Sequence, residues 1–336
     1  MVDGFIAYTR ARATQAADLA AAVDRLASSV AELAAGGRLS GPGPVFVGIG
    51  ASLAAACAPV WTLRERGIHS WRLGAGDHPL PFPPSSHPVF GVSQSGRSAE
   101  TLAVLETIPV GKRYAVVNVV PSPIADLASG LVDLGNIADS YASTIGFTAT
   151  VAALGLIADA WHGGRVDEGW SRIGDVVAAV ERDLGPQIRS LAPLFAAATS
   201  ADFVGAGPFV GSAEAGALLF REVARIPATG MSTRQYLHGA MESAGGGVHV
   251  LFGGDREFAA AETLAGAGHP AILVTSEDFD PGPLAHLVRL PALPPSQAAI
   301  AQIVVVQILV EAVAAVRSVA IEEFVFHNND IKVPEL

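Results

Sequence analysis

The sequence is short of cysteine and of charge. Cys57 is the single cysteine among 336 residues, so the chain cannot form an internal disulfide. Charged residues make up only 16% of the sequence and half of it is apolar, a balance that predicts a folded protein with a large buried core. Cys57 falls in an alanine-rich stretch with a helical pattern, where we expect a buried structural thiol instead of a nucleophile.

Basic residues are also few. The chain has 21 Lys and Arg against 32 Asp and Glu, with a net charge of −11 and an isoelectric point near 5.2, which argues against nucleic acid as a partner. No secretory signal pattern is present at the start, and the apolar stretch 298–316 is interrupted by Gln302, Gln307 and Glu311. We therefore expect a cytoplasmic protein that binds no nucleic acid and enters no membrane.

Motifs for metals and cofactors are missing as well. The nine histidines are scattered along the chain, without the HxH, HExxH or Cys/His spacings that mark metal sites. No cofactor fingerprint occurs either. We expect neither a metal ion nor an organic cofactor.

An internal repeat sets the expected architecture. Residues 46–50 (Phe-Val-Gly-Ile-Gly) recur as residues 203–207 (Phe-Val-Gly-Ala-Gly), at an offset of 157 residues. The same offset carries Arg64-Glu65 onto Arg221-Glu222, the strand-like run 114–119 onto 271–276, and the helix from 143 onto the helix from 300. We therefore predict an α/β fold of two tandem doubly wound units, each a mostly parallel sheet with helices on both faces.

The predicted elements fit this division. Strand-like runs lie at 45–49, 70–73, 89–92, 114–119 and 131–134, and helical patterns lie between them at 53–66, 99–107 and 124–129. The last of these helices has Ser122 as its expected N-cap. Helical segments at 143–162 and 169–199 join the halves, and a long helix near 297–316 closes the second. The predicted organisation is leading helices (1–40), a first unit (41–165), linking helices (166–198) and a second unit with a C-terminal tail (199–336).

Residues 89–101 carry the clearest chemical signal. An apolar run is followed by a turn of hydroxyls and glycine and then by a helix start; the turn contains Ser93, Gln94, Ser95, Gly96 and Ser98. Hydroxyls, backbone amides and the positive end of a helix can converge there on an anion. Because the turn has no Walker lysine and no GxGxxG, we predict a small phosphorylated molecule as the ligand. The alternative is an ordinary polar loop.

The pattern Ser-Gln-Ser-Gly-x-Ser-x-Glu-Thr resembles the phosphosugar-binding loop of sugar isomerase (SIS) domains, including the isomerase half of glucosamine-6-phosphate synthase. The resemblance extends over about residues 30–334. It implies tandem SIS units, a small phosphorylated sugar as ligand and a homodimer with a shared active site. Val2 stands where the glutaminase half would begin with its cysteine, so we expect no release of ammonia from glutamine by that route.

The second unit has no equal of the phosphate loop. Residues 251–255 (Leu-Phe-Gly-Gly-Asp) take its place, without a cluster of hydroxyls and with Asp255, which would repel a phosphate. We predict one phosphate site per chain, on the first unit.

Two further loops match the family's sugar-binding segments. Gly50 and Ser52 match its first substrate loop, although Ala51 replaces a threonine and removes one hydroxyl. Tyr141 and Ser143 match a loop that touches the sugar, although the lysine that follows in the synthase is absent. The alternative for Ser143 is simple capping of the next helix.

The resemblance also implies catalytic residues. Glu222 corresponds to the glutamate that moves a proton between C1 and C2, a step that needs such a base. The alternative is a surface carboxylate paired with Arg221 or Arg225. His238 corresponds to the histidine that opens the sugar ring and comes from the partner subunit; the alternative is a structural histidine.

The C-terminal tail departs from the family pattern. The resemblance places Lys332, as a third catalytic residue, on the tail lysine that the synthase uses on its open-chain substrate; the alternative is an ordinary solvated lysine. His327 is near enough in sequence to reach the same pocket. Leu219 replaces a family lysine three residues before the glutamate.

The predicted function is that of an enzyme on a sugar 6-phosphate. It would be an aldose–ketose isomerase or a deaminase or deglycase that works through an enediol or enolamine. The alternative is a phosphosugar sensor without catalysis.

Overall fold

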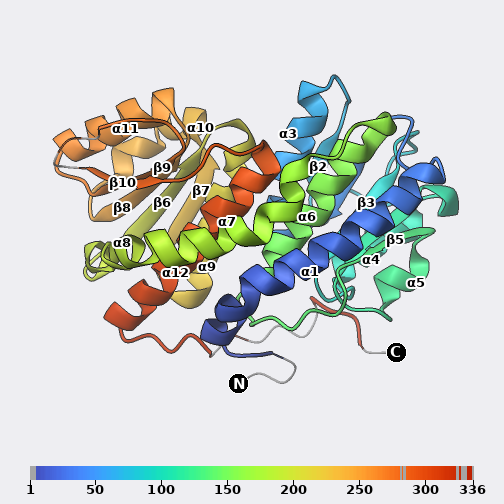
Figure 1. Cartoon of the computed structure of the whole chain (residues 1–336), viewed down its shortest axis with the longest axis horizontal. Coiled ribbons are helices and arrows are strands. Elements are labelled where there is room, and N and C mark those ends of the chain that lie inside the picture. The colour runs from blue at the N-terminus through green and yellow to red at the C-terminus, as the bar shows by residue number, and fades with distance from the viewer. Residues whose placement is uncertain (1–4, 281, 283–284, 323–324, 327–330, 335–336) are drawn as a thin grey trace.

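The computed structural model describes residues 5–280, 282, 285–322, 325–326 and 331–334. It contains two parallel sheets of five strands each (Figure 1). The first has the order β2-β1-β3-β4-β5 and the second β10-β9-β8-β6-β7. The strands are β1 (Val45–Gly48), β2 (Trp71–Gly74), β3 (Val89–Ser93), β4 (Arg113–Val117), β5 (Gly130–Asp133), β6 (Ser200–Gly205), β7 (Ala228–Ser232), β8 (Gly247–Phe252), β9 (Ala271–Thr275) and β10 (Ala285–Arg289).

Read in the reverse direction, the second sheet has the same strand order as the first. β6 stands where β1 stands, and β9 stands where β4 stands, as the offset of 157 residues requires. The internal repeat predicted from the sequence is thus confirmed in the topology. The five predicted strands of the first unit are all present, each within two residues of its expected ends.

Helices cover both faces of the first sheet. Phe46, Phe90 and Tyr114 belong to one apolar core and Val45 and Val89, next to them in the strands, belong to another. Side chains alternate across a strand, so both faces are buried, as expected of parallel strands rich in valine. The helices are α1 (Tyr8–Ala35), α2 (Ala51–Ala55), α3 (Cys57–Glu65), α4 (Ala99–Thr107), α5 (Pro123–Leu127), α6 (Ile145–Ala160), α7 (Ile173–Ala179), α8 (Gly185–Arg189), α9 (Val210–Val223), α10 (Thr233–Leu237), α11 (Asp255–Gly266) and α12 (Pro295–Val316).

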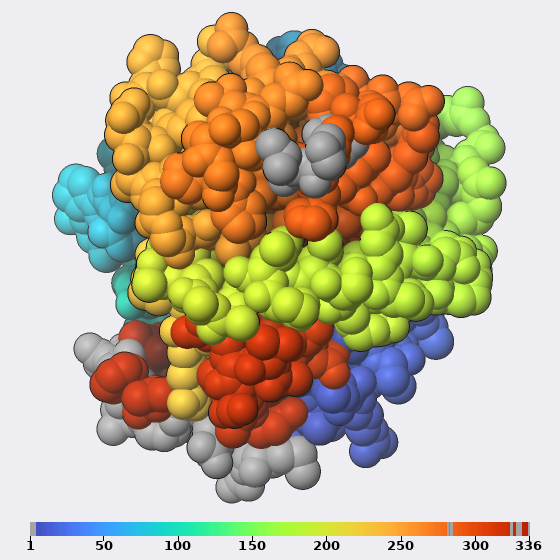
Figure 2. Space-filling view, turned by 90° about the vertical axis from the view of Figure 1, so that its left-hand side faces the viewer, coloured from blue at the N-terminus to red at the C-terminus, as the bar shows by residue number. Residues whose placement is uncertain are grey.

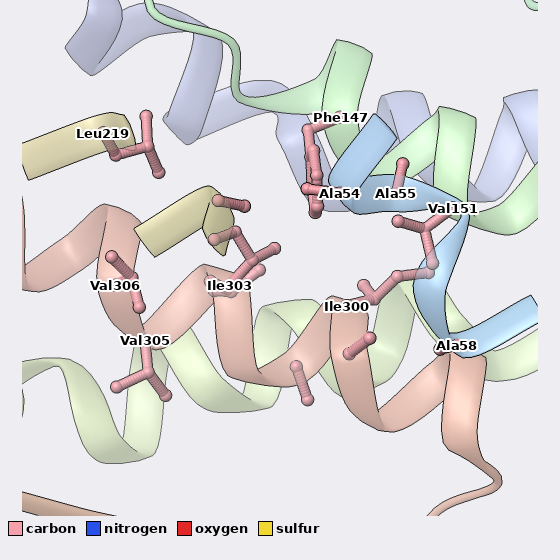
Figure 3. Close-up of a cluster of buried hydrophobic side chains, with 14 of the residues drawn as sticks. Ala54, Ala55, Ala58, Phe147, Val151, Leu219, Ile300, Ile303, Val305 and Val306 are labelled. Carbon is pink, nitrogen blue, oxygen red and sulfur yellow. The ribbon is translucent and has the colours of Figure 1, made fainter. Parts of the chain in front are cut away.

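The two units pack through a shared layer of helices. Figure 1 shows α6, α9 and α12 between the sheets; α12 contacts both α6 and α9, and α2 contacts α6 and α9. Figure 3 shows Phe147 of α6, Leu219 of α9 and Ile303 of α12 in this layer, with Ala54 of α2 nearby. One apolar core runs through both units, so each unit completes the other.

The long helices α6 and α12 owe their composition to that core. The stretch Ile145–Gly163 and helix α12 are long and apolar enough to cross a membrane by length and composition. Most of each is nevertheless buried against the rest of the chain, 89% and 78% of the tested windows. Because both helices are buried on all sides, apolar residues occupy every face of each helix.

Two predicted helices are divided. The expected helix 53–66 breaks at Ala56 into α2 and α3, because Pro59 has no N–H to donate and its ring would collide with the carbonyl of residue 55. Residues 169–199 form several short helical segments instead of one helix, including a wide turn at Val180–Leu184. Cys57 is half-buried, and burial raises the pKa of its thiol.

Candidate functional site

A cavity of about 260 Å³ lies between the two units, at the carboxyl end of β1. It brings together the predicted residues Gly50, Ala51, Tyr141, Ser143 and Glu222, from segments up to 172 residues apart. The rest of its wall is apolar and comes from Phe147, Ala215, Leu218, Leu219 and Ile303. The crevice beyond the carboxyl ends of parallel strands is where α/β folds bind ligands.

Glu222 lies in the last turn of α9 and faces this cavity. Burial raises the pKa of its carboxyl to about 7, from an ordinary 4.5. Arg221 does not form the surface pair considered from the sequence, because it is exposed and its Nε donates a hydrogen bond to the carbonyl of Ala228. Among the described residues no ion pair neutralises Glu222, so the carboxyl can exchange a proton near neutral pH.

Tyr141 stands beside this carboxyl. Its pKa is raised to about 12, first by burial and then by the negative charges of Glu222 and Glu322, while Arg225 acts in the opposite direction. The phenol therefore stays protonated at neutral pH. The cavity thus holds a protonated phenol next to a carboxyl that titrates near neutrality.

Asp139 holds the turn that carries Tyr141 and Ser143, and the sequence analysis missed it. Its buried carboxylate accepts hydrogen bonds from the backbone N–H of Thr144 (3.0 Å) and of Gly146 (2.9 Å) at the start of α6. The Ser143 hydroxyl also donates to Asp139, at 2.9 Å. Ser143 therefore does not cap the helix; Asp139 does, and Ser143 is oriented by it. An aspartate shortly before a helix start is the signal that could have revealed this.

The predicted phosphate loop follows β3 directly. Ser93 is buried at the end of the strand, and its Oγ lies 2.9 Å from the Oγ of Ser98 at the N-cap of α4. Gly96 has φ +63°, and a Cβ there would lie 2.0 Å from the Oγ of Ser122. Only glycine fits this turn. Ser95 accepts a hydrogen bond from the backbone N–H of Arg97.

Several buried polar atoms around this loop have no hydrogen-bond partner among the residues that the structure describes. They are Oε1 and Nε2 of Gln94, Oγ1 of Thr101 and Oγ of Ser122. Unpaired buried polar atoms are costly in a folded protein, and a polar ligand is one means of pairing them. Ser122 stands at the N-cap of α5, as predicted, but its side chain makes no capping bond.

Gln94 joins the loop to the cavity. Its amide packs against Gly146 at the start of α6, where a Cβ on the glycine would lie 1.6 Å from Nε2. Ser143, one turn earlier, lines the cavity. Ser52 is placed in the first turn of α2, next to Ala51, and is not among the residues that line the cavity.

The C-terminal tail pairs with the phosphate loop. The backbone N–H of Ala99 donates to the carbonyl of Ile331 (3.2 Å), and that of Val333 donates to the carbonyl of Arg97 (3.0 Å). Lys332 is exposed and forms an antiparallel bridge with Ser98. The tail lysine thus lies at the phosphate loop and not among the cavity's lining residues, whereas His327 lies outside the described residues.

His238 is not part of the cavity within a single chain. It is exposed and caps the C-terminal end of α10. Its predicted role in a partner subunit's site stays a prediction.

In the second unit, a side chain of the same unit occupies the turn at residues 251–255, which is equivalent to the predicted phosphate loop. The carboxylate of Glu257 is buried in the first turn of α11, where it accepts hydrogen bonds from the N–H of Gly254 (3.1 Å) and the hydroxyl of Thr233. An internal carboxylate thus occupies the position that an anion would take. This supports the prediction of a single phosphate site.

A larger hollow of about 900 Å³ lies elsewhere, between α1, α12 and residues 178–193. Figure 2 shows this face, where the yellow-green segment meets the red of α12 and the blue of α1. Arg12 in its wall is already bound by Glu181 and Glu311, and much of the rest is alanine.

No family model and no curated protein matches the chain. Among solved structures it is similar to the C-terminal domain of glucosamine-fructose-6-phosphate aminotransferase from Francisella tularensis, with a TM-score of 0.79 and 17% identity over 96% of this chain and 99% of that chain. It is also similar to tagatose-6-phosphate ketose/aldose isomerase from Escherichia coli, with a TM-score of 0.75 and 15% identity over 92% of each chain.

The chain has the SIS fold. The family resemblance found in the loop sequence is confirmed at this level. At these identities the likeness concerns the fold, and the activity has to be argued from the site.

Proposed function

We propose that the protein is an enzyme that acts on a sugar 6-phosphate in the cytoplasm, as an aldose–ketose isomerase or as a deaminase or deglycase. Glu222 carries the proposal. Its carboxyl faces a cavity between the units, and its pKa of about 7 suits a group that takes up and returns a proton near neutral pH.

In the proposed reaction Glu222 removes a proton from the carbon next to the carbonyl of the open-chain sugar. The electrons of the broken C–H bond form the C=C bond of an enediol, while the carbonyl oxygen takes up a proton. Return of a proton to the former carbonyl carbon, with loss of the hydroxyl proton on the carbon that was first deprotonated, completes an aldose–ketose isomerisation. With an amine on the substrate, the same steps pass through an enolamine to an imine, which water hydrolyses to a carbonyl and the free amine.

The phosphate loop would hold the other end of the substrate. Hydroxyls and amides from one turn would bind the phosphate oxygens, and Lys332 would offset part of their charge. The sugar would lie along the start of α2 and the 141–143 turn. The proposed phosphate ligands are Ser93, Gln94, Ser95, Gly96 and Ser98, and the proposed sugar contacts are Gly50, Ala51, Ser52, Tyr141 and Ser143.

We also propose a homodimer, in which His238 serves the cavity of the partner chain and opens the sugar ring. Its exposure in the single chain supports this arrangement. No cofactor is needed for proton transfer of this kind.

A phosphosugar sensor is the second candidate. The observation that favours it is Leu219, a buried apolar residue in the cavity wall where the resemblance implies a lysine. A cavity with fewer charged groups is able to bind a sugar without converting it.

Turnover assays separate the two candidates. We would test fructose-6-phosphate, tagatose-6-phosphate, glucosamine-6-phosphate and amines glycated with a sugar 6-phosphate. The matched control for Glu222→Gln is Glu65→Gln, because Glu65 is the equivalent glutamate of the first unit and lies on the surface. The enzyme proposal predicts that Glu222→Gln lowers kcat by about 10²- to 10⁴-fold, that Glu65→Gln leaves it unchanged, and that kcat/KM rises with pH through about 7.

Binding of these sugars without turnover would establish the sensor instead. If these sugars neither bind to the protein nor are turned over by it, the loop is an ordinary turn.

A further inference from the structure

The cavity and the phosphate loop differ in the polar groups that they offer to a ligand. At the loop lie the N-terminal end of α4 and the exposed Lys332, which suit an anion. In the cavity, the described lining residues include no lysine, arginine or histidine, and Glu222 is the charged group among them. A ligand with an anionic end and a hydrogen-bond-donating end would match both.

Ser143 can only accept a hydrogen bond from a ligand in the cavity. A hydroxyl has one proton to donate, and Ser143 donates its proton to Oδ2 of Asp139 at 2.9 Å. Ser143 is half-buried and lines the cavity, so its remaining lone pairs are within reach of a ligand. The ligand group beside Ser143 is therefore a donor.

The direction of this hydrogen bond depends on the charge of Asp139. Backbone N–H groups of Ser140 (2.8 Å), Thr144 (3.0 Å) and Gly146 (2.9 Å) donate to its two oxygens. Burial raises the pKa of this carboxyl, but a carboxylate that accepts several backbone N–H bonds stays ionised. Asp139 therefore has no proton to donate, and Ser143 is the donor of the pair.

The charge around the cavity favours a cationic donor. Tyr141 in the cavity wall experiences the charges of two carboxylates, Glu222 and Glu322, and of one guanidinium, that of Arg225. The balance is negative once Glu222 has lost its proton. A protonated amine would donate to these acceptors and also offset their charge, which a hydroxyl cannot do.

We infer that the substrate carries a protonated amine at the end opposite its phosphate, and that Ser143 and Glu222 select this amine over a hydroxyl. The substrate class is then an amino sugar 6-phosphate or an amine linked to a sugar 6-phosphate. The inference rests on the proposed function, because the phosphate loop has to hold the other end of the same molecule.

The reaction is then release of the amine instead of isomerisation. The ammonium loses one proton to water, and Glu222 takes the proton of the carbon that bears the amine while the carbonyl oxygen takes up another. The resulting enolamine receives a proton at the former carbonyl carbon and becomes an imine. Water adds to the imine carbon, and the C–N bond breaks to give a carbonyl and the free amine.

The probes are open-chain alditol 6-phosphates, which have no carbonyl and cannot be turned over. 1-Amino-1-deoxyglucitol 6-phosphate and 2-amino-2-deoxyglucitol 6-phosphate carry the amine at the two carbons that can bear it, and glucitol 6-phosphate is the hydroxyl control. In calorimetric titration at least one amine is expected to bind at least about tenfold more tightly than the control. This preference should grow as pH rises through about 7, because Glu222 ionises there while the amine stays protonated.

Ser143→Ala removes the acceptor and leaves Asp139 its backbone donors, so the fold is retained. It should lower the preference for the amine by about three- to tenfold, and Glu222→Gln should abolish the pH dependence of the preference. The matched control is Ser140→Ala, because the Ser140 hydroxyl donates to the carbonyl of Ala142 within the turn (2.6 Å) and does not line the cavity. This variant should keep the full preference.

Equal affinity for the amines and for glucitol 6-phosphate would overturn the inference and leave the proposed function in place. A preference that Ser143→Ala does not change would likewise overturn the selection by Ser143. If none of these alditol phosphates binds, the proposed function itself is contradicted, and the inference falls with it.

Discussion

The two units share a backbone but divide the chemistry between them. At the offset of 157 residues, Gly96 is equivalent to Gly253, and both have positive φ in the turn before a helix. Around Gly96, buried polar atoms of Gln94, Thr101 and Ser122 have no hydrogen-bond partner among the described residues, whereas a Cβ at Gly253 would lie 2.3 Å from the carboxylate of Glu257. This contrast supports the proposal that the loop of the first unit binds an anion, because in the second unit the side chain of Glu257 occupies the equivalent turn.

The two equivalent glutamates, Glu65 and Glu222, differ in the opposite sense, because here the second unit has the residue that faces the cavity. Glu65 is exposed and accepts a hydrogen bond from the indole of Trp61 at 2.6 Å. Its equivalent Glu222 faces the cavity, and burial raises the pKa of its carboxyl. A duplicated fold supplies two equivalent positions for each proposed function, and in each pair only one position has the environment that the proposed function needs.

The largest effect on stability is expected at Glu222. Its pKa is about 7 in the folded chain and near the ordinary 4.5 when unfolded, so between these values the folded state binds the extra proton. Stability therefore falls as pH rises through this window, by up to about 3 kcal/mol. Glu222→Gln removes this cost, so it should stabilise the protein by about that amount near pH 8 and hardly at all near pH 4. Denaturant unfolding at both pH values measures it.

The matched control is Glu65→Gln, expected to change stability by less than about 0.5 kcal/mol at either pH. Equal behaviour of the two variants would contradict the proposed environment of Glu222.

The two turn glycines are expected to differ in ligand binding. Gly96→Ala strains the backbone and displaces Ser122, so we expect phosphosugar affinity to fall at least about tenfold. Gly253→Ala places a side chain at positive φ as well, so it should lower the free energy of unfolding by about 1–3 kcal/mol. It should leave the phosphosugar affinity unchanged. Calorimetric titration of both variants with fructose-6-phosphate checks this. Loss of affinity in both would mean that the two loops are not functionally distinct.

Glu257 and its equivalent Glu100 sharpen the same comparison. Glu257→Ala leaves the N–H of Gly254 and the hydroxyl of Thr233 without their acceptor, at a cost of about 1–3 kcal/mol. Glu100 lies in the first turn of α4 and is only half-buried, so Glu100→Ala should cost less than about 1 kcal/mol. Thermal unfolding of both variants gives the difference; a larger loss for Glu100→Ala would be the contrary result.

The fold could be predicted from the sequence because the internal repeat and the apolar strands are patterns that are visible directly along the chain. Each predicted strand of the first unit is a short apolar run, and such runs keep their identity whatever packs against them. The break between α2 and α3 was also readable, because Pro59 cannot continue a helix that began a turn earlier.

The site was only partly readable. Family motifs led to Gly50, Ala51, Tyr141, Ser143 and Glu222, which the cavity brings together. An aspartate before a helix start hinted at the capping role of Asp139, but its full set of donors, like the donors that Glu257 satisfies in the second loop, depends on side-chain directions, because one carboxylate accepts hydrogen bonds from several residues. The roles of His238 and Lys332 stay predictions, as do the proposed unit boundaries.

The most direct test of this division of labour is the stoichiometry of phosphosugar binding. Calorimetric titration with fructose-6-phosphate should give one site per chain, and Ser98→Ala, which removes a loop hydroxyl, should weaken that site. Two sites per chain, or one site that is indifferent to Ser98, would contradict the account.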